Sequence, residues 1–180
     1  MTKSEGKPEA HAGESAAEAF GEIYECTMPK VFRYISYRVV DTDLAQDLTS
    51  TVFEKALKGF SGYRADKASS STWLIAIARN TVIDYYRSLN SKQQAIALDQ
   101  VDEIASNRPS PEDDAIRGDE LRRLYISLAG LPQEEREIIS LKFGGELTNR
   151  QIARMLGFSE SKVGTKLYRA VSRLRDKFEE

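Results

Sequence analysis

Near its carboxyl end, the chain carries the boundary signals of two helices joined by a tight turn. Thr148 and Gln151 have the spacing of a capping box, in which the threonine caps a backbone N–H and the glutamine reaches back. Gly157 suits the left-handed residue that ends a helix, and Ser159 can cap the next one. A short helix, a Gly-containing turn and a second helix make the helix-turn-helix layout, which we predict here.

The second helix of this motif has two faces. At about 100° per residue, its apolar side chains share one arc, and its basic side chains form a stripe centred roughly 120° away. One face can pack on a helical bundle while the other meets a polyanion. The arc holds Val163, Leu167, Ala170, Val171, Leu174 and Phe178, and the stripe holds Lys162, Lys166, Arg169 and Arg173.

A basic helix face is by itself usually just solvated, but its place in a helix-turn-helix favours contact with DNA. Such a second helix lies in the major groove, with its amino-terminal side chains at base edges. Phosphate contacts would add salt dependence, whereas only base-edge contacts would carry sequence specificity. The side chains expected to face DNA are Thr165, Lys166, Tyr168 and Arg169.

The net charge of −2 argues weakly against a protein that coats nucleic acid unaided. The basic residues near the carboxyl end nevertheless form a local cationic patch, because the only acids between Arg150 and Lys177 are Glu160 and Asp176.

Helical periodicity governs most of the chain, and no strong two-residue alternation is present. We therefore predict an all-α fold with two small helical domains joined by a flexible linker. Pro29 is expected to mark a junction inside the first domain, and Ser110 with Pro111 is expected to open the second. The predicted divisions are a disordered tail over 1–17, a first domain over 18–88, a linker over 89–109 and a second domain over 110–180.

The segment from Asp43 to Leu57 is predicted to be an amphipathic helix with an acidic outer stripe. A solvated face is the simplest interpretation of such a stripe. Metal or acid/base chemistry is a weaker alternative, because no histidine accompanies the carboxylates. The inner stripe holds Leu44, Leu48, Val52 and Ala56, and the outer stripe holds Asp43, Asp47, Ser50 and Glu54.

A second amino-terminal helix is predicted from Trp73 to Arg87, after a polar loop over 59–72. Aromatic and basic side chains alternate in this loop, a pattern that can stack on unpaired bases and hold phosphates, although a flexible loop alone would also explain it. The loop holds Phe60, Tyr63, Arg64 and Lys67. The helix is expected to bury Trp73, Leu74, Ile77, Ala78, Thr81 and Tyr85 and to carry Asn80, Asp84 and Arg87 on another side.

Residues for catalysis or for a metal site are scarce. Cys26 and His11 are the only cysteine and histidine, so neither an intrachain disulfide nor a Cys/His zinc site can form. No Gly-rich run ends in Lys-Ser or Lys-Thr, which excludes a phosphate-binding loop of that type. We expect a protein that is not an enzyme and uses no cofactor, with Cys26 in the core and His11 solvated.

No apolar run approaches the roughly 18 residues that cross a bilayer, so no membrane insertion is expected. The segment from Met1 to Ser15 is polar and acidic and does not resemble a signal peptide. These features predict a cytoplasmic protein.

Both halves of the chain resemble the extracytoplasmic-function (ECF) sigma factors of the sigma-70 superfamily, over about Phe20 to Arg87 and Ser110 to Phe178. Each motif is weak alone, but their order, with a linker between the halves, is specific. The first half matches through Asp43-x-Ala-Gln-Asp-Leu48 with Val52-Phe53, and through Trp73-Leu74-x-x-Ile-Ala-Arg-Asn80 with Asp84 and Arg87. The second half matches through Leu131-Pro132, Arg136-Glu137, Leu147-Thr148, Gln151-Ile152-Ala153, Leu156-Gly157, Ser159 and Arg169-Ala170.

The resemblance implies a promoter-recognition subunit that binds core RNA polymerase and directs transcription initiation. The first domain would be sigma region 2, and the acidic face of Asp43, Asp47, Ser50 and Glu54 would dock on the clamp helices of the polymerase. The loop over 59–72 and Asn80 would capture an unpaired base flipped out of the −10 element. The implied −10 contacts are Tyr63, Arg64, Lys67, Trp73, Asn80, Asp84 and Arg87.

The second domain would be sigma region 4, which reads the −35 element as duplex DNA and meets the polymerase flap. The family is commonly held inactive by an anti-sigma factor, so such a partner is expected. The linker can extend to roughly 70 Å, enough for the two domains to occupy separate promoter elements. The implied −35 contacts are Lys142, Arg150, Lys162, Thr165, Lys166, Tyr168, Arg169 and Arg173.

The chain departs from the family pattern at two places. Ser50-Thr51 stands where relatives often carry Gln followed by an acid. Gly164 stands where relatives often carry a basic residue, which costs the helix about 0.5–1 kcal/mol.

Two other functions compete with this interpretation. An ordinary helix-turn-helix repressor or activator would explain the carboxy-terminal motif, but it leaves the acidic stripe and the 73–87 helix without a role. Such regulators are usually dimers, so unaided dimeric binding to a palindrome would favour this alternative. An enzyme with a DNA-binding appendage would need a catalytic constellation that the sequence does not offer.

Overall fold

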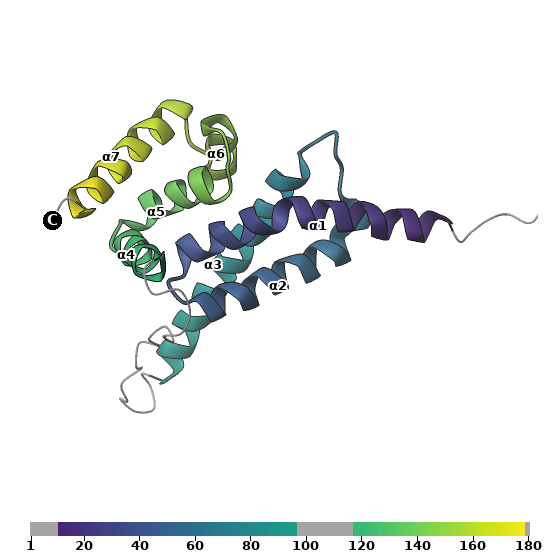
Figure 1. The fold of residues 1–180 in the computed structure, drawn as a ribbon, viewed down its shortest axis with the longest axis horizontal. Helices are drawn as coiled ribbons and strands as arrows, with labels where there is room; N and C mark the ends of the chain where they lie inside the picture. The colour runs from purple at the N-terminus through teal and green to yellow at the C-terminus, as the bar shows by residue number, and fades with distance from the viewer. Residues whose placement is uncertain (1–10, 97–116, 179–180) are drawn as a thin grey trace, which may run out of the picture.

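A computed structural model gives the fold and describes residues 11–96 and 117–178. Seven α-helices and two short helical turns make up these residues, and no strand occurs among them, so the all-α prediction is confirmed (Figure 1). The elements are α1 His11–Arg38, α2 Thr42–Gly59, the 3-10 turn η1 Phe60–Gly62, α3 Ser70–Ile96, α4 Arg117–Ala129, α5 Gln133–Ile139, the π-helical turn η2 Ser140–Gly144, α6 Asn149–Leu156 and α7 Glu160–Phe178.

Helices α1, α2 and α3 form an amino-terminal bundle. Asp41 begins α2 as its N-cap, and its carboxylate accepts a hydrogen bond from the N–H of Leu44 at 3.0 Å. The three helices bury one apolar face each around a common centre. That centre includes Val31 and Ile35 of α1, Ala45 and Val52 of α2, and Leu74 and Ala78 of α3.

Three boundaries differ from the expected ones. Pro29 lies inside α1 rather than at a junction, because apolar side chains on both sides of it pack into the bundle and keep the helix continuous. Helix α1 begins at His11, within the segment expected as a tail, and α3 continues to Ile96, into the segment expected as a linker. The expected start at Ser110 and Pro111 lies outside the described residues.

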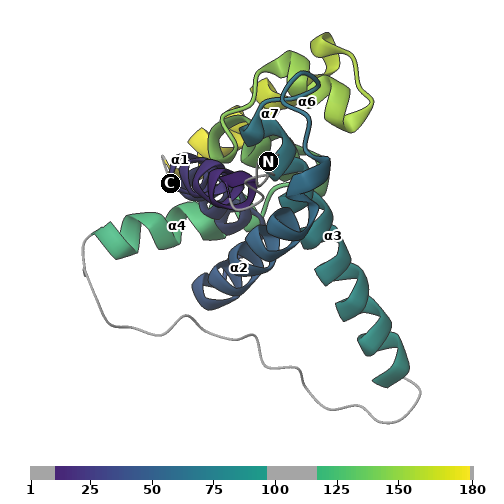
Figure 2. The same ribbon diagram turned by 90° about the vertical axis from the view of Figure 1, so that its right-hand side faces the viewer.

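Helices α4 to α7 form a carboxy-terminal bundle, which packs directly against the amino-terminal one (Figures 1 and 2). Helix α5 and the turn η2 lie against α1, and one apolar cluster runs through both bundles. Ile138, Leu141 and Leu147 join the same buried cluster as Val31 and Leu74. The two halves therefore share part of their core.

Gly144 is the point of closest approach between the bundles. A Cβ atom at this position would lie 2.7 Å from the Cα of Tyr34 and 2.9 Å from its backbone nitrogen. Only glycine allows η2 to sit directly on the backbone of α1. The neighbouring Glu146 has a positive φ of 55°, and its carboxylate pairs with Lys30 at 2.7 Å and with Arg33 at 3.4 Å.

Candidate nucleic-acid interface

The helix-turn-helix is built as its sequence predicts. The Thr148 hydroxyl accepts from the backbone N–H of Gln151 at 3.3 Å, and the side-chain Oε1 of Gln151 accepts from the backbone N–H of Thr148 at 2.8 Å. Gly157 is left-handed, with φ 69° and ψ 31°, and ends α6. The Ser159 hydroxyl accepts from the N–H of Lys162 at 3.2 Å and begins α7.

The apolar arc of α7 packs on α5 and α6 as expected, with one exception. Val163 and Ala170 are fully buried, and Leu167 and Leu174 are half-buried. Val171 is 44% exposed, because the neighbouring helices cover the side of α7 that carries Val163 and Ala170 and leave Val171 at its edge. The side chain of Phe178 lies outside the described part of the structure.

Most of the basic stripe of α7 is engaged within its own bundle. Lys166 is 22% exposed and pairs with Glu134 of α5 at 2.5 Å, an interaction that lowers the pKa of the Glu134 carboxyl. Arg173 pairs with the buried Glu135 at 2.8 Å. The ammonium of Lys162 lies 3.5 Å above the ring of Phe158.

The freely presented surface of α7 is therefore narrower than the stripe. Tyr168 is 75% exposed, and Thr165 and Arg169 are also exposed. On the neighbouring elements, Lys142 is half-buried in η2, and Arg150 is exposed at 3.9 Å from Glu160. The structure brings the predicted −35 contacts onto one bundle but leaves them unequal in access.

The acidic stripe of α2 is exposed along its whole length. Leu48, Val52 and Ala56 are buried beneath it, and Leu44 is half-buried, as the sequence predicts. No group of acidic, cysteine or histidine side chains among the described residues could hold a metal ion. The exposed residues are Asp43, Asp47, Ser50 and Glu54.

The loop before α3 forms an aromatic cluster. The rings of Tyr63 and Trp73 lie with centroids 4.7 Å apart, and Phe60 lies 6.1 Å from Tyr63. The Tyr63 hydroxyl donates to the backbone carbonyl of Ala68 at 3.1 Å, which shapes the loop. Arg64 pairs with Asp66 at 2.9 Å. Lys67 is exposed beside them.

Helix α3 carries its predicted polar side chains outward. Asn80, Asp84 and Arg87 are exposed, and Arg87 lies 3.4 Å from Asp84. The predicted inner side is confirmed in that Leu74, Ala78 and Thr81 are buried and Trp73, Ile77 and Tyr85 are half-buried. Ile75 and Val82 are also fully buried, so the inner face of α3 is turned toward them from the predicted one and leaves Trp73 and Ile77 at its edge.

The prediction that Cys26 belongs to the core is wrong. Its thiol is exposed on α1, because the bundle covers the side of the helix that carries Ile23 and the buried Thr27. The side chain of His11 lies outside those that the structure describes.

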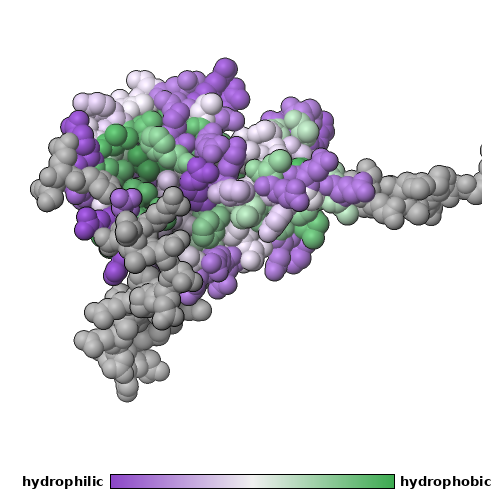
Figure 3. Space-filling view, in the orientation of Figure 1, coloured by the Kyte–Doolittle hydropathy of each residue, from purple (hydrophilic) through white to green (hydrophobic). Residues whose placement is uncertain are grey.

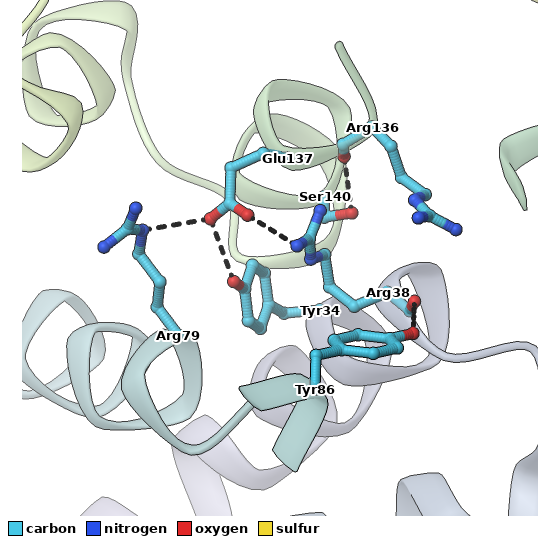
Figure 4. A network of polar contacts seen from close by, with 7 residues as sticks. All are labelled: Tyr34, Arg38, Arg79, Tyr86, Arg136, Glu137 and Ser140. Atoms are coloured by element: carbon cyan, nitrogen blue, oxygen red, sulfur yellow. Dashed lines mark hydrogen bonds and ion pairs between the residues drawn. The ribbon is translucent and has the colours of Figure 1, made fainter. Parts of the chain in front are cut away.

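Sequence reasoning missed a polar network at the seam between the bundles (Figure 4). The Glu137 carboxylate of α5 accepts from the Tyr34 hydroxyl at 3.2 Å, from Arg38 at 2.9 Å and from Arg79 at 3.1 Å. Burial, followed by the charge of Glu137, raises the pKa of Tyr34 well above its ordinary value. The available signal was an acid, Glu137, directly before the apolar pair Ile138 and Ile139.

A further seam contact reaches the start of α3. The side-chain amide of Gln151 donates to the hydroxyl of Thr72 at 3.0 Å. Residues of the helix-turn-helix and of the predicted −10 segment are thus hydrogen-bonded to each other.

Within the described residues, no helix is long and apolar enough to span a bilayer.

Comparison with known proteins agrees with this architecture. The family model for sigma-70 region 2 matches residues 23–92, and the model for sigma-70 region 4 matches residues 121–174. Over 165 residues the chain is 33% identical to the ECF RNA polymerase sigma factor BldN of Streptomyces coelicolor, covering 92% of this chain and 61% of that protein. It is 27% identical to the ECF RNA polymerase sigma factor SigX of Bacillus subtilis, covering 90% and 84%.

Two solved structures share the fold across both bundles. The sigma factor RpoE of Bartonella quintana, in complex with the anti-sigma factor NepR, matches with a TM-score of 0.71 at 17% identity, over 90% of this chain and 98% of that one. CnrH, in complex with the cytosolic domain of CnrY, matches with a TM-score of 0.68 at 20% identity, over 93% and 94%. With the two region models matched in order on the two helical bundles, the chain belongs to the ECF sigma factors of the sigma-70 family.

Proposed function

We propose that this protein binds core RNA polymerase and directs promoter-specific transcription initiation through −10 and −35 elements. The observation that carries the proposal is the pairing of an exposed helix-turn-helix surface on one bundle with an exposed acidic face and aromatic loop on the other. A simple operator-binding repressor has no use for the second set of surfaces.

Core polymerase would bind at two places. The exposed carboxylates of Asp43, Asp47 and Glu54 offer charge complementarity to a basic helical surface, with Ser50 between them as a hydrogen-bonding group. The flap would reach the carboxy-terminal bundle, where apolar residues gather in the view of Figure 3 and where Leu121, Ile126 and Val171 are exposed on α4 and α7.

Promoter DNA would be held by both bundles. Asn80 and the loop of Tyr63, Arg64 and Lys67 would receive the flipped base of the −10 strand, close to the half-buried Trp73. Asp84 and Arg87 extend that surface along α3. The −35 duplex would be read by α7, and Tyr168, Thr165 and Arg169 are the side chains best exposed for base edges.

The arrangement of the two bundles supports control by an anti-sigma factor. Each solved structure reported above with a similar fold is a complex with another protein, and for the sigma factor RpoE that protein is the anti-sigma factor NepR. The ion pairs of Glu137 tie the bundles together, so the closed form would hold the two proposed DNA surfaces in one fixed arrangement. A partner that binds across the closed form would hold the protein inactive in the cytoplasm.

The first experiment reconstitutes transcription. Purified protein is added to bacterial core polymerase with fragments of its own genome, and the 5′ ends of the transcripts are mapped. Discrete starts behind a shared pair of upstream motifs are expected. Asp47→Lys should abolish these starts, whereas Glu22→Lys, an exposed acid on α1, should retain them.

Changes in DNA reading give a separate readout. Arg169→Ala should reduce the preference for the −35 motif while leaving polymerase binding intact. If core polymerase gives no specific starts and the protein alone footprints a palindrome, the repressor function takes the place of the one proposed.

A further inference from the structure

A pocket of about 390 Å³ opens at the seam between the two bundles, and one of its lining residues, Arg87, also belongs to the surface proposed above for −10 DNA. Residues of α1 and α3 line it on one side, and Gln133 at the start of α5 lines it on the other. This volume is within the range of small-ligand sites. Its polar lining consists of Arg38, Tyr86, Arg87, Asn90, Ser91 and Gln133.

Arg38 is the unusual member of this lining. Its side chain is 3% exposed, and one of its nitrogens, Nη2, pairs with Glu137 at 2.9 Å. Its Nε and Nη1 atoms have no hydrogen-bond acceptor among the described residues. A buried guanidinium with unpaired donors is costly unless an acceptor meets it, and the positive charge of Arg38 favours an anionic one.

The surroundings of Arg38 are also rich in positive charge. Arg136 lies near it, with a buried Nε that likewise has no acceptor within the described part of the chain. Burial and then the charge of Arg38 lower the pKa of Arg136. Glu137 is the buried carboxylate of this cluster and is already shared with Arg79 and Tyr34, so the guanidinium groups outnumber it.

We propose that this seam pocket binds a small phosphate-bearing anion. Guanidinium groups pair with phosphate oxygens in bidentate fashion, and the side-chain amide of Asn90 adds a neutral donor. The hydroxyls of Tyr86 and Ser91 donate instead to the backbone carbonyls of Arg38 and Arg87, and so shape the pocket wall. Because Gln133 belongs to one bundle and Arg38 and Arg87 to the other, the complete pocket exists only when the bundles are together. The ligand therefore stabilises the closed form by mass action.

Free phosphate compounds and the phosphates of DNA share this chemistry. Arg38 is buried, and Gln133 lines the pocket from the other bundle, so the site favours a small free anion over a DNA strand. Inorganic pyrophosphate is the probe, titrated calorimetrically into the full chain without polymerase, against sodium sulfate at equal ionic strength. One saturable site for pyrophosphate is expected, with at least tenfold weaker binding of sulfate.

Variants locate the site. Arg87→Gln should weaken pyrophosphate binding at least tenfold. Arg64→Gln, which changes another exposed arginine with an aspartate partner, in the loop over 59–72, should change it less than twofold. Gln133→Ala should weaken it about threefold from the other bundle. Gly144→Ala, whose new Cβ meets the Tyr34 backbone, should separate the bundles and abolish binding.

Four results would overturn the proposal. These are no saturable site, equal losses in Arg87→Gln and Arg64→Gln, sulfate binding equal to pyrophosphate, or unchanged affinity in both Gln133→Ala and Gly144→Ala. Displacement of pyrophosphate by a short single-stranded oligonucleotide that binds more tightly would assign the pocket to DNA instead. None of these results depends on transcription, so the sigma function and the anion site fail separately.

Discussion

The carboxylate of Glu137 lies 2.9 Å from the guanidinium of Arg38, and this ion pair joins α5 of region 4 to the last turn of α1 in region 2. Both side chains are almost completely removed from solvent. The pair is thus a buried contact between the two parts of the protein that match sigma-70 region 2 and region 4.

Removal of the Glu137 carboxylate should destabilise the closed form strongly. Glu137→Ala leaves Arg38 buried without its partner, so we expect a loss of about 3–5 kcal/mol in the free energy of unfolding. Urea denaturation followed by circular dichroism measures it. Glu146→Gln, which breaks exposed ion pairs at the same seam, should cost less than about 1 kcal/mol. Equal effects of the two variants would contradict the structural importance of the buried pair.

Two glycines of the helix-turn-helix should respond to alanine in opposite directions. Gly157 is left-handed, so Gly157→Ala should destabilise the protein by about 1–2 kcal/mol. Gly164 lies within α7, where an added Cβ would meet no other atom, so Gly164→Ala should stabilise the protein by about 0.5–1 kcal/mol. Thermal unfolding of the two variants provides the comparison, and a shift of the same sign in both would contradict the geometry of the turn.

Glu134 should restrain the DNA affinity of Lys166. Because the two side chains pair at 2.5 Å, Glu134→Gln should release the ammonium group of Lys166 on α7. We expect tighter binding to duplexes of unrelated sequence. The affinity should also fall more steeply with salt concentration, by the amount that about one additional phosphate contact adds. Fluorescence anisotropy at several salt concentrations measures both quantities. Glu120→Gln, an exposed acid on α4, is the matched control and should retain the original slope.

Stability should decline at alkaline pH in a way that depends on Tyr34. Burial and the nearby Glu137 raise the pKa of Tyr34 above its ordinary value of 10.0, so the unfolded chain ionises first. The corresponding stability is fully present below about pH 10 and is lost as the pH rises toward the folded-state pKa. Burial also raises the pKa of Tyr37 and of Tyr86, so Tyr34→Phe should reduce the slope without removing it.

The free energy of unfolding between pH 8 and pH 11 tests this expectation, with Tyr168→Phe as an exposed control. An unchanged slope in Tyr34→Phe would mean that the tyrosine does not keep its proton in the folded protein.

Local signals in the sequence were enough to predict the helix-turn-helix and the acidic stripe. The capping box at Thr148, the left-handed Gly157 and the buried line from Leu48 to Ala56 depend on neighbours within a few residues. For such features, chain spacing and side-chain type determine the geometry.

Features that depend on distant neighbours could not be predicted in this way. Cys26 is exposed because of which side of α1 faces the bundle, and nothing in its local pattern states it. Lys166 belongs to the basic stripe but is occupied by Glu134 from another helix. The seam around Glu137 joins side chains up to 103 positions apart, so its role emerges only when the two bundles are in contact.

The apolar cluster that passes through both bundles has a consequence for the lifetime of the protein when it is not bound to polymerase. Separation of the bundles would expose Ile138, Leu141 and Leu147 to water, at a cost that scales with the apolar area uncovered. An opened molecule that is not bound to polymerase would thus expose apolar surface, which favours aggregation. Its opened backbone would also be more accessible to proteases. The supply of polymerase would then set the lifetime of the factor as well as its activity.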